Sequence, residues 1–198
     1  MKTKVAAIYG KQDIRIREFE LPEITDNELL VSVISDSVCL STWKAAALGS
    51  DHKRVPDDLE NHPVITGHEC AGIIIEVGKN LTDKYKKGQR FVLQPAMGLP
   101  SGYSAGYSYE YFGGNATYMI IPEVAINLGC VLPYHGSYFA AASLAEPMCC
   151  IIGAYNANYH TTPYVYEHRM GIKPGGSIAL LACAGPMGIG AIAVSYTH

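Results

Sequence analysis

The sequence GHECAG at residues 67–72 is the stretch that decides how this chain is interpreted. It places an imidazole, a carboxyl group and a thiol in a row, and a further cysteine, Cys39, lies 28 residues before Gly67. Thiolate and imidazole are strong protein ligands for zinc, and a neighbouring carboxylate can bind the ion or orient its other ligands. The sequence therefore predicts a metal site around Cys39 and His68.

Length and composition are those of an ordinary globular protein. The chain has 198 residues, which suits one domain or one and part of a second, and a domain of this size can bury a real core. Hydrophobic residues make up 48% and charged residues 17%, as is common in globular proteins. A formal net charge of -3 gives no reason to expect nucleic acid or an anionic membrane as a partner.

Several features predict a cytoplasmic protein. Residues 1–10 have no long apolar core of the kind found in secretory signals. None of the six cysteines forms a C-x-x-C pair, which favours reduced thiols. Residues 177–194 carry no charge, but Gly185-Pro186 interrupts them. This segment therefore favours a strand, a turn and a helix over a membrane span, which needs about 20 apolar residues.

The first two-thirds of the chain predicts short strands and turns. Ile14 and Ile16 alternate with Arg15 and Arg17, the pattern of a half-exposed strand. Further apolar runs lie near Val31 and over residues 64–66 and 71–77, and glycines and prolines separate them. We expect a compact β-rich domain over residues 1–160.

The character of the sequence changes near residue 139. Residues 139–157 are rich in alanine and predict helix, and residues 171–176 predict a turn. Residues 177–182 then form an apolar run without alternation, which is typical of a parallel strand covered on both faces. With the glycine-rich turn that follows, this run predicts the opening βα step of a dinucleotide-binding domain over residues 161–198.

The dinucleotide-binding domain is expected to be incomplete. Such a domain needs several more βα units, and the acidic residue expected about 20 positions after the glycines is absent. The chain is therefore predicted to be a fragment of a longer protein. Residues 194–198 resemble a translated sequencing adaptor and are left out of the functional argument.

The longer pattern around GHECAG resembles the zinc-containing alcohol and polyol dehydrogenases of the medium-chain dehydrogenase/reductase superfamily. The pattern continues through Gly78 and the sequence GQRF at 88–91. The resemblance implies a mostly β, GroES-like catalytic domain followed by the first βα unit of an α/β Rossmann domain. Within the superfamily the chain is most similar to bacterial L-sorbose-1-phosphate reductases. The remaining stretches that carry the two likenesses are 39–44, 55–58, 113–118, 146–147, 152–160 and 185–188.

The resemblance implies a catalytic zinc ion held by Cys39, His68 and a carboxylate from Glu69 or Glu146. In the sorbitol-dehydrogenase branch a Glu-Pro motif supplies a carboxylate to or near the metal, and Glu146-Pro147 matches it. Liver-type alcohol dehydrogenases have cysteine at that place, so the glutamate favours the polyol branch. Taken singly, Cys39 could instead be a buried apolar side chain and His68 a hydrogen-bonded core histidine.

A second, structural zinc site is not expected. Many relatives hold such an ion with four closely spaced cysteines, but no cysteine lies between Cys70 and Cys130 here. Aromatic side chains crowd that region instead. We expect them to pack in a core or an interface, with a sugar-binding role as the alternative. They are Tyr103, Tyr107, Tyr109, Tyr111 and Phe112.

Ser41 and Lys44, which follow Cys39 in the sequence, are the predicted catalytic residues. Ser41 stands where relatives place a hydroxyl that hydrogen-bonds the substrate oxygen. Thr42 and Lys44 stand where relatives often have aspartate and histidine, so the usual proton route is altered. The ammonium group of Lys44 could bind a phosphate of the substrate, or it could be a solvated surface lysine.

A nicotinamide dinucleotide, NAD or NADP, is expected at the glycine-rich turn. Gly185 would allow the backbone to approach the pyrophosphate, and Gly188 would allow close helix packing. Cys183 replaces the first glycine of the G-x-G-x-x-G pattern, which favours an altered turn. The predicted cofactor residues are Gly185, Pro186, Met187 and Gly188.

Together these features predict part of a zinc-dependent, NAD(P)-linked oxidoreductase of a small-molecule polyol or sugar phosphate, a homo-oligomer at full length. The chain alone is expected to lack hydride transfer, because most of the cofactor domain is missing. The alternatives are a related dehydrogenase for threonine, butanediol or a simple alcohol, and a non-catalytic metal-binding module with the GroES-like fold.

Overall fold

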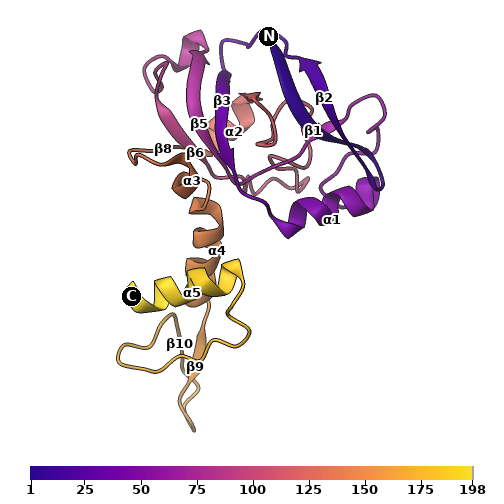
Figure 1. Cartoon of the computed structure of the whole chain (residues 1–198). Helices are drawn as coiled ribbons and strands as arrows, with labels where there is room; N and C mark the ends of the chain where they lie inside the picture. Colours follow the sequence, from indigo (N-terminus) through magenta and orange to yellow (C-terminus); the bar gives the residue numbers. More distant parts are fainter. Residues whose placement is uncertain (198) are drawn as a thin grey trace. The chain divides into compact units, whose positions relative to one another are not determined.

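The computed structural model describes residues 1–197 (Figure 1), and the chain divides into two compact units. The first unit comprises residues 1–144 and the second begins at residue 145. The domain boundary drawn from the sequence, between residues 160 and 161, remains a prediction about the parent domains. Residue 198, the last of the five adaptor-like residues, lies outside the described part of the chain.

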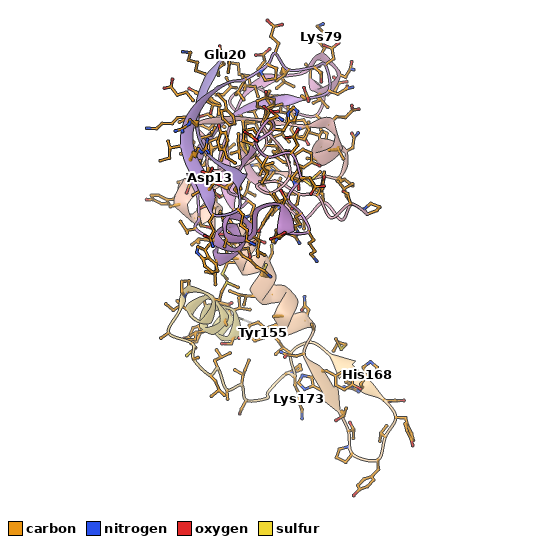
Figure 2. The ribbon with its side chains drawn as sticks, turned by 90° about the vertical axis from the view of Figure 1, so that its right-hand side faces the viewer. Asp13, Glu20, Lys79, Tyr155, His168 and Lys173 are labelled. Carbon is orange, nitrogen blue, oxygen red and sulfur yellow. The ribbon has the colours of Figure 1, made fainter. Side chains whose placement is uncertain are left out.

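A three-stranded antiparallel sheet, in the order β2-β1-β4, forms one side of the first unit. It contains β1 (Lys2–Gly10), β2 (Asp13–Glu20) and β4 (Val64–Ile65). The strand predicted from Ile14 and Ile16 is present as β2, but both isoleucines are exposed rather than half-buried. The reason is that neither face of this edge strand is covered, since all residues from Ile14 to Glu18 are exposed. The side chains at its two ends, Asp13 and Glu20, are labelled in Figure 2.

A five-stranded antiparallel sheet, in the order β7-β3-β5-β6-β8, contains most of the core. Apolar side chains of its strands, such as Val31, Ile74 and Phe91, are fully buried. Gly72 allows the central pair of strands to approach, since a Cβ there would lie 2.0 Å from the carbonyl oxygen of Ser32. The strands are β3 (Leu29–Asp36), β5 (Cys70–Val77), β6 (Arg90–Leu93), β7 (Tyr118–Ile121) and β8 (Val131–Pro133).

Short helices connect these strands. The segment after β3 forms α1, whose first residue directly follows Cys39. The helix predicted over residues 139–157 is present as α3 and α4, interrupted at Ser143 and Leu144. The helices of the first unit are α1 (Leu40–Leu48), η1 (Gly49–Asp51), η2 (Lys79–Leu81), α2 (Glu123–Asn127) and α3 (Phe139–Ala142).

The second unit contains α4 (Ala145–Asn156), the hairpin of β9 (Tyr159–Thr161) and β10 (His168–Met170), and α5 (Pro186–Thr197). Its two helices pack through Ile151, Tyr155 and Val194. The hydroxyl of Tyr155, labelled in Figure 2, donates a hydrogen bond to the carbonyl oxygen of Ala191 at 2.8 Å. The helix predicted after the glycine-rich turn is therefore present, as α5.

The prediction of a strand over residues 177–182 is wrong. Residues 177–180 form no strand, and residues 181–184 form a turn. A central strand of a parallel sheet needs hydrogen-bonding neighbours. Among the described residues of this unit, the only sheet is the antiparallel β9–β10 hairpin. No helix within residues 1–197 combines the length and apolar character needed to span a bilayer.

Candidate metal centre

Strand pairing brings together two segments that lie far apart in the sequence. β3 and β5 are antiparallel, and Asp36 at the end of β3 pairs with Cys70 at the start of β5. The residues just after β3 therefore lie beside those just before β5. Cys39 belongs to the first group and caps the N-terminus of α1, while His68 and Glu69 belong to the second.

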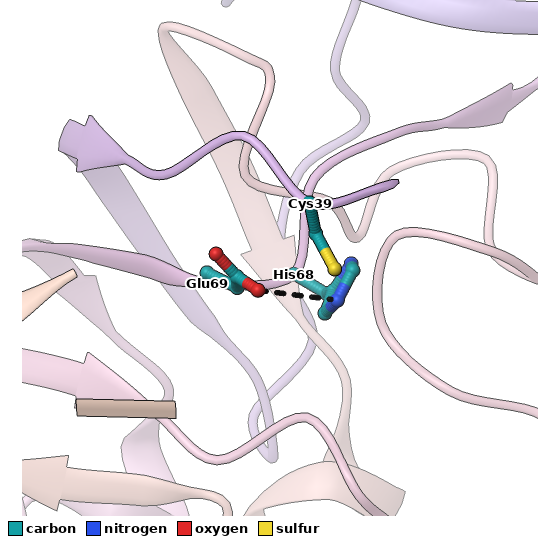
Figure 3. Close-up of side chains that lie close together, drawn as sticks. All are labelled: Cys39, His68 and Glu69. Atoms are coloured by element: carbon teal, nitrogen blue, oxygen red, sulfur yellow. Dashed lines mark ion pairs between the residues drawn. The ribbon is translucent and has the colours of Figure 1, made fainter. Parts of the chain in front are cut away.

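Cys39, His68 and Glu69 each offer one ligand atom, and these atoms lie within 4.8 Å of one another (Figure 3). The carboxylate oxygen Oε1 of Glu69 is 3.8 Å from Nε2 of His68. Ligand atoms around a tetrahedral zinc ion are about 3.3–3.6 Å apart, given bonds of about 2.0–2.3 Å. A small contraction of this cluster would therefore accommodate the ion.

The state of the His68 side chain fits a metal ligand. The residue is only 5% exposed, and its Nδ1 is buried with no hydrogen-bond partner among the described residues. Burial lowers the pKa of His68, the charge of Glu69 opposes this effect, and the charge of Arg54 adds to it. Neutral imidazole is the form that binds metal ions. Thiol, imidazole and carboxylate together are a donor set that zinc accepts in catalytic sites.

Residues at the end of β3 hold the carboxylate of Glu69 in place. The hydroxyl of Ser37 donates a hydrogen bond to Oε2 of Glu69. The side chain of Asp36 accepts the backbone N–H of Glu69 at 2.9 Å and the side-chain amide of Asn115 at 2.7 Å. Burial raises the pKa of Asp36 to about 7, although the hydrogen bond from Glu69 opposes the rise.

Gly67 gives the loop its conformation. Its φ is +89°, and a Cβ at this position would lie 2.1 Å from Oδ2 of Asp36 and 2.4 Å from the backbone nitrogen of Asn115. Glycine is the residue that adopts this φ without strain and leaves room for both groups. The first glycine of the GHECAG stretch is therefore required for Asp36 to reach the loop.

Tyr107 lies beside the metal centre. Its ring centroid is 5.0 Å from that of His68, and its hydroxyl oxygen is 3.4 Å from Nε2 of His68. The expectation that the aromatic region packs in a core holds for Tyr107 and Phe112, which are 2% and 1% exposed. The same burial places Tyr107 next to the proposed ligands, a position that no motif in the sequence indicated.

The supporting roles of Asp36, Ser37 and Asn115 could not be predicted from the sequence. Asp36 and Ser37 are visible only as polar residues that end the apolar run before Cys39. Asn115 lies 79 positions after Asp36. Its contribution depends on tertiary contacts, for which a single sequence carries no signal.

The two predicted catalytic residues lie on α1. Ser41 and Lys44 are three positions apart, so they share one face of the helix, and both are exposed. Glu146, the other predicted carboxylate ligand, belongs to the first turn of α4 in the second unit, where it accepts a hydrogen bond from the Cys150 thiol at 3.4 Å. Its metal-binding role stays a prediction.

The predicted cofactor residues form the start of α5. Pro186 and Met187 are its first two residues. A Cβ on Gly188 would lie 2.4 Å from the backbone of Cys183, whereas Gly185 has open space around it. In the turn before the helix, the positive φ falls on Ala182, at 53°, and not on Cys183.

Sequence comparison identifies the domain. The family model described as "Alcohol dehydrogenase GroES-like domain" matches residues 25–130. Over 192 residues the chain is 93% identical to "Uncharacterized protein YggP" of Escherichia coli, covering 97% of this chain and 45% of that protein. It is 71% identical to "Mannitol-1-phosphate 5-dehydrogenase" of Aliivibrio fischeri, covering 96% and 45%.

More distant relatives agree with this assignment. The chain is 45% identical to "L-sorbose 1-phosphate reductase" of Klebsiella pneumoniae, covering 98% of this chain and 47% of the relative. It thus spans about half the length of these curated relatives. A cobalt- and zinc-bound thermostable alcohol dehydrogenase from Pyrobaculum aerophilum has the same fold, with a TM-score of 0.72 at 19% identity, over 100% of this chain and 57% of that chain.

Proposed function

Because the chain belongs to the family of alcohol dehydrogenases with a GroES-like domain, we propose that it is part of a zinc-dependent, NAD- or NADP-linked oxidoreductase of polyols or sugar phosphates. The observation that carries the proposal is the cluster of Cys39, His68 and Glu69, whose ligand atoms lie within 4.8 Å of one another. A non-catalytic GroES-like module has no need for these three donors at one place.

Cys39, His68 and a carboxylate, from Glu69 or Glu146, would hold the zinc ion. When bound, zinc supplies a Lewis acid for the alcohol or carbonyl oxygen of the substrate. The α1 dipole favours a negatively charged ligand such as the Cys39 thiolate at its N-terminus. Ser37 and Asp36 hold Glu69 in its orientation, and the buried ring of Tyr107 keeps water from one side of His68.

Ser41 is the residue we assign to the proton on the substrate oxygen. It lies in the first turn of α1, two residues after Cys39, and its side chain is exposed. Thr42 and Lys44 replace the aspartate and histidine that relatives often carry. An exposed hydroxyl can pass a proton directly to water, so Ser41 would not need the longer relay.

The start of α5 is the proposed binding site for the pyrophosphate of NAD or NADP. Open space around Gly185 would let an anion approach the backbone, and the N-terminal end of a helix favours negative charge. Gly188 supports the site indirectly, because its lack of a side chain lets α5 start directly against Cys183.

The names of the relatives support the substrate class. One names a phosphorylated polyol and the other a phosphorylated sugar, at 71% and 45% identity to this chain. We further propose that the full-length protein is a cytoplasmic homo-oligomer. All six cysteines are free thiols, which suits a reducing compartment.

Zinc binding by the purified chain tests the proposal. We expect one zinc ion per chain by elemental analysis, and a large loss of affinity in the variants Cys39→Ser and His68→Ala. The variants Cys149→Ser and His135→Ala remove an exposed thiol and an exposed imidazole elsewhere and serve as matched controls. A chain that binds no zinc, or a double variant C39S/H68A that keeps it, would refute the proposed site.

Substrate profiling of the full-length protein tests the reaction itself. We expect NAD(P)-dependent interconversion of a phosphorylated polyol and its ketose. Turnover of threonine, butanediol or a simple alcohol at higher efficiency would reassign the substrate within the same family.

A further inference from the structure

Two basic side chains lie on the faces of Tyr107, next to the metal centre. The guanidinium carbon of Arg54 is 5.2 Å from the centroid of the Tyr107 ring. The ring of His52 stacks on Tyr107 with a centroid distance of 5.7 Å and an interplanar angle of 11°. Since the rings of Tyr107 and His68 are 5.0 Å apart, the Arg54 guanidinium lies at most about 10 Å from the His68 ring.

Three cationic side chains act on the charge state of His52. Burial lowers the pKa of His52, and the nearby charges of Arg54, Lys44 and Lys53 lower it further, with no carboxylate acting against them. We call Lys44, Lys53 and Arg54 the basic cluster. Lys44 lies on α1, and Lys53 and Arg54 lie in the loop that follows η1. This concentration of positive charge occurs in a chain whose formal net charge is -3.

The cations of this cluster are not neutralised within residues 1–197. No salt bridge within 4.0 Å involves Arg54, Lys44 or Lys53 in that part of the chain, whereas Lys11 pairs with Asp51 and Arg15 with Asp13. The hydrogen bonds recorded at Arg54 use its backbone, whose N–H donates to His52 Nδ1 and whose carbonyl oxygen accepts from Ser108. The guanidinium donors are therefore available to a ligand.

We propose that Arg54, assisted by Lys44, binds the phosphate group of the substrate, and that Tyr107 sets the distance between this phosphate and the metal centre. The inference rests on the proposed function for its reaction and adds the residue that selects phosphorylated over free polyols. Arginine suits the task because its planar fork of N–H donors binds phosphate through two parallel hydrogen bonds. Arg54 is half-buried against the ring of Tyr107. This position limits the motion of the guanidinium group and strengthens the cation–π contact between the two side chains.

Binding of inorganic phosphate to the metal-free chain is the first test, because phosphate bound there cannot be coordinated to zinc. We expect saturable binding by calorimetry or 31P NMR, weakened about tenfold or more in Arg54→Met and less in Arg54→Lys. Methionine keeps an apolar stem against Tyr107. Lys87→Met removes one positive charge from the exposed turn before β6 and should leave binding unchanged. Equal affinity in R54M and the wild type would overturn the inference.

Kinetics of the full-length protein are the second test. Arg54→Met should raise the KM for the phosphorylated substrate at least tenfold, while the KM for the unphosphorylated substrate and the zinc content stay unchanged. An equal loss toward both substrates would mean that Arg54 only supports the fold of the site, and the inference would fail. If the wild-type chain binds no zinc, the proposed function fails, whatever Arg54 does with phosphate.

Discussion

Oδ1 of Asp36 accepts the backbone N–H of Glu69 at 2.9 Å, which ties the end of β3 to the loop that carries His68. The same two segments are joined again through the hydroxyl of Ser37 and the carboxylate of Glu69. The spacing between Cys39 and His68 is thus set by a network that contains neither residue. Disturbing this network should change metal affinity without removing a ligand.

The variant Asp36→Asn should lower zinc affinity by about 10- to 100-fold, because side chains that orient metal ligands commonly contribute that much. Competition against a zinc chelator measures the effect. Asp83→Asn, which replaces an exposed aspartate in the loop before β6, is the matched control. Unchanged affinity in D36N would show that Glu69 is held without help from Asp36.

The metal-free chain should lose stability as the pH rises toward neutrality. The folded-state pKa of Asp36 is about 7, above its usual value of 3.8, so the protonated form favours the folded state. The resulting stabilisation is complete below the unfolded pKa and is lost as the pH rises through about 7, by roughly a few kcal/mol at most. Urea unfolding at pH 5 and pH 8 with a chelator present measures it. The pH dependence should be smaller in D36N, and an identical slope would assign it to other groups.

Gly67→Ala should destabilise the chain by about 3 kcal/mol or more, because the new methyl group meets Asp36 and Asn115 and the φ of +89° is strained for alanine. Gly88→Ala separates the two causes, since Gly88 has a similar φ of +83° but no neighbour within 4 Å. Its cost should be only about 1–2 kcal/mol. Urea denaturation gives both values, and equal losses would remove the argument from close packing.

Lys44→Met in the full-length protein should raise the KM for a phosphorylated ketose far more than for its unphosphorylated form, because the ammonium group is expected to contact only the phosphate. Steady-state kinetics with both substrates measure the difference, and Lys87→Met controls for the loss of one charge. Equal effects on the two substrates would remove the phosphate-binding role of Lys44.

Two of the three clustered ligands could be predicted from a local signal, and so could individual strands of the fold. Alternation at Ile14–Arg17 marks β2, and the GHECAG stretch contains both His68 and Glu69. Cys39 is distant from them in sequence, but the pairing of β3 with β5 makes it a spatial neighbour. The resemblance to dehydrogenases placed Cys39 in the predicted ligand set, whereas the strand pairing that brings it to His68 is seen only in the structure.

The remaining features depend on contacts that have no local pattern. Tyr107 is one of five aromatic residues within ten positions, and only the folded structure separates the one beside His68 from the rest. Arg54 lies in an irregular loop, where its relation to Tyr107 is set by packing. The strand expected over residues 177–182 failed for a related reason: an apolar run forms a central strand only when neighbouring strands pair with it.

Cys39 and His68 bracket the 28 residues 40–67, which include α1 and β4. An ion bound to both would act as a cross-link that closes this segment into a ring, and closing a long loop reduces the entropy of the unfolded chain. Removal of the ion should then increase local opening of residues 40–67 more than opening of β6 and β7. The rate of limited proteolysis within residues 40–67 would therefore report how much of the protein has metal bound.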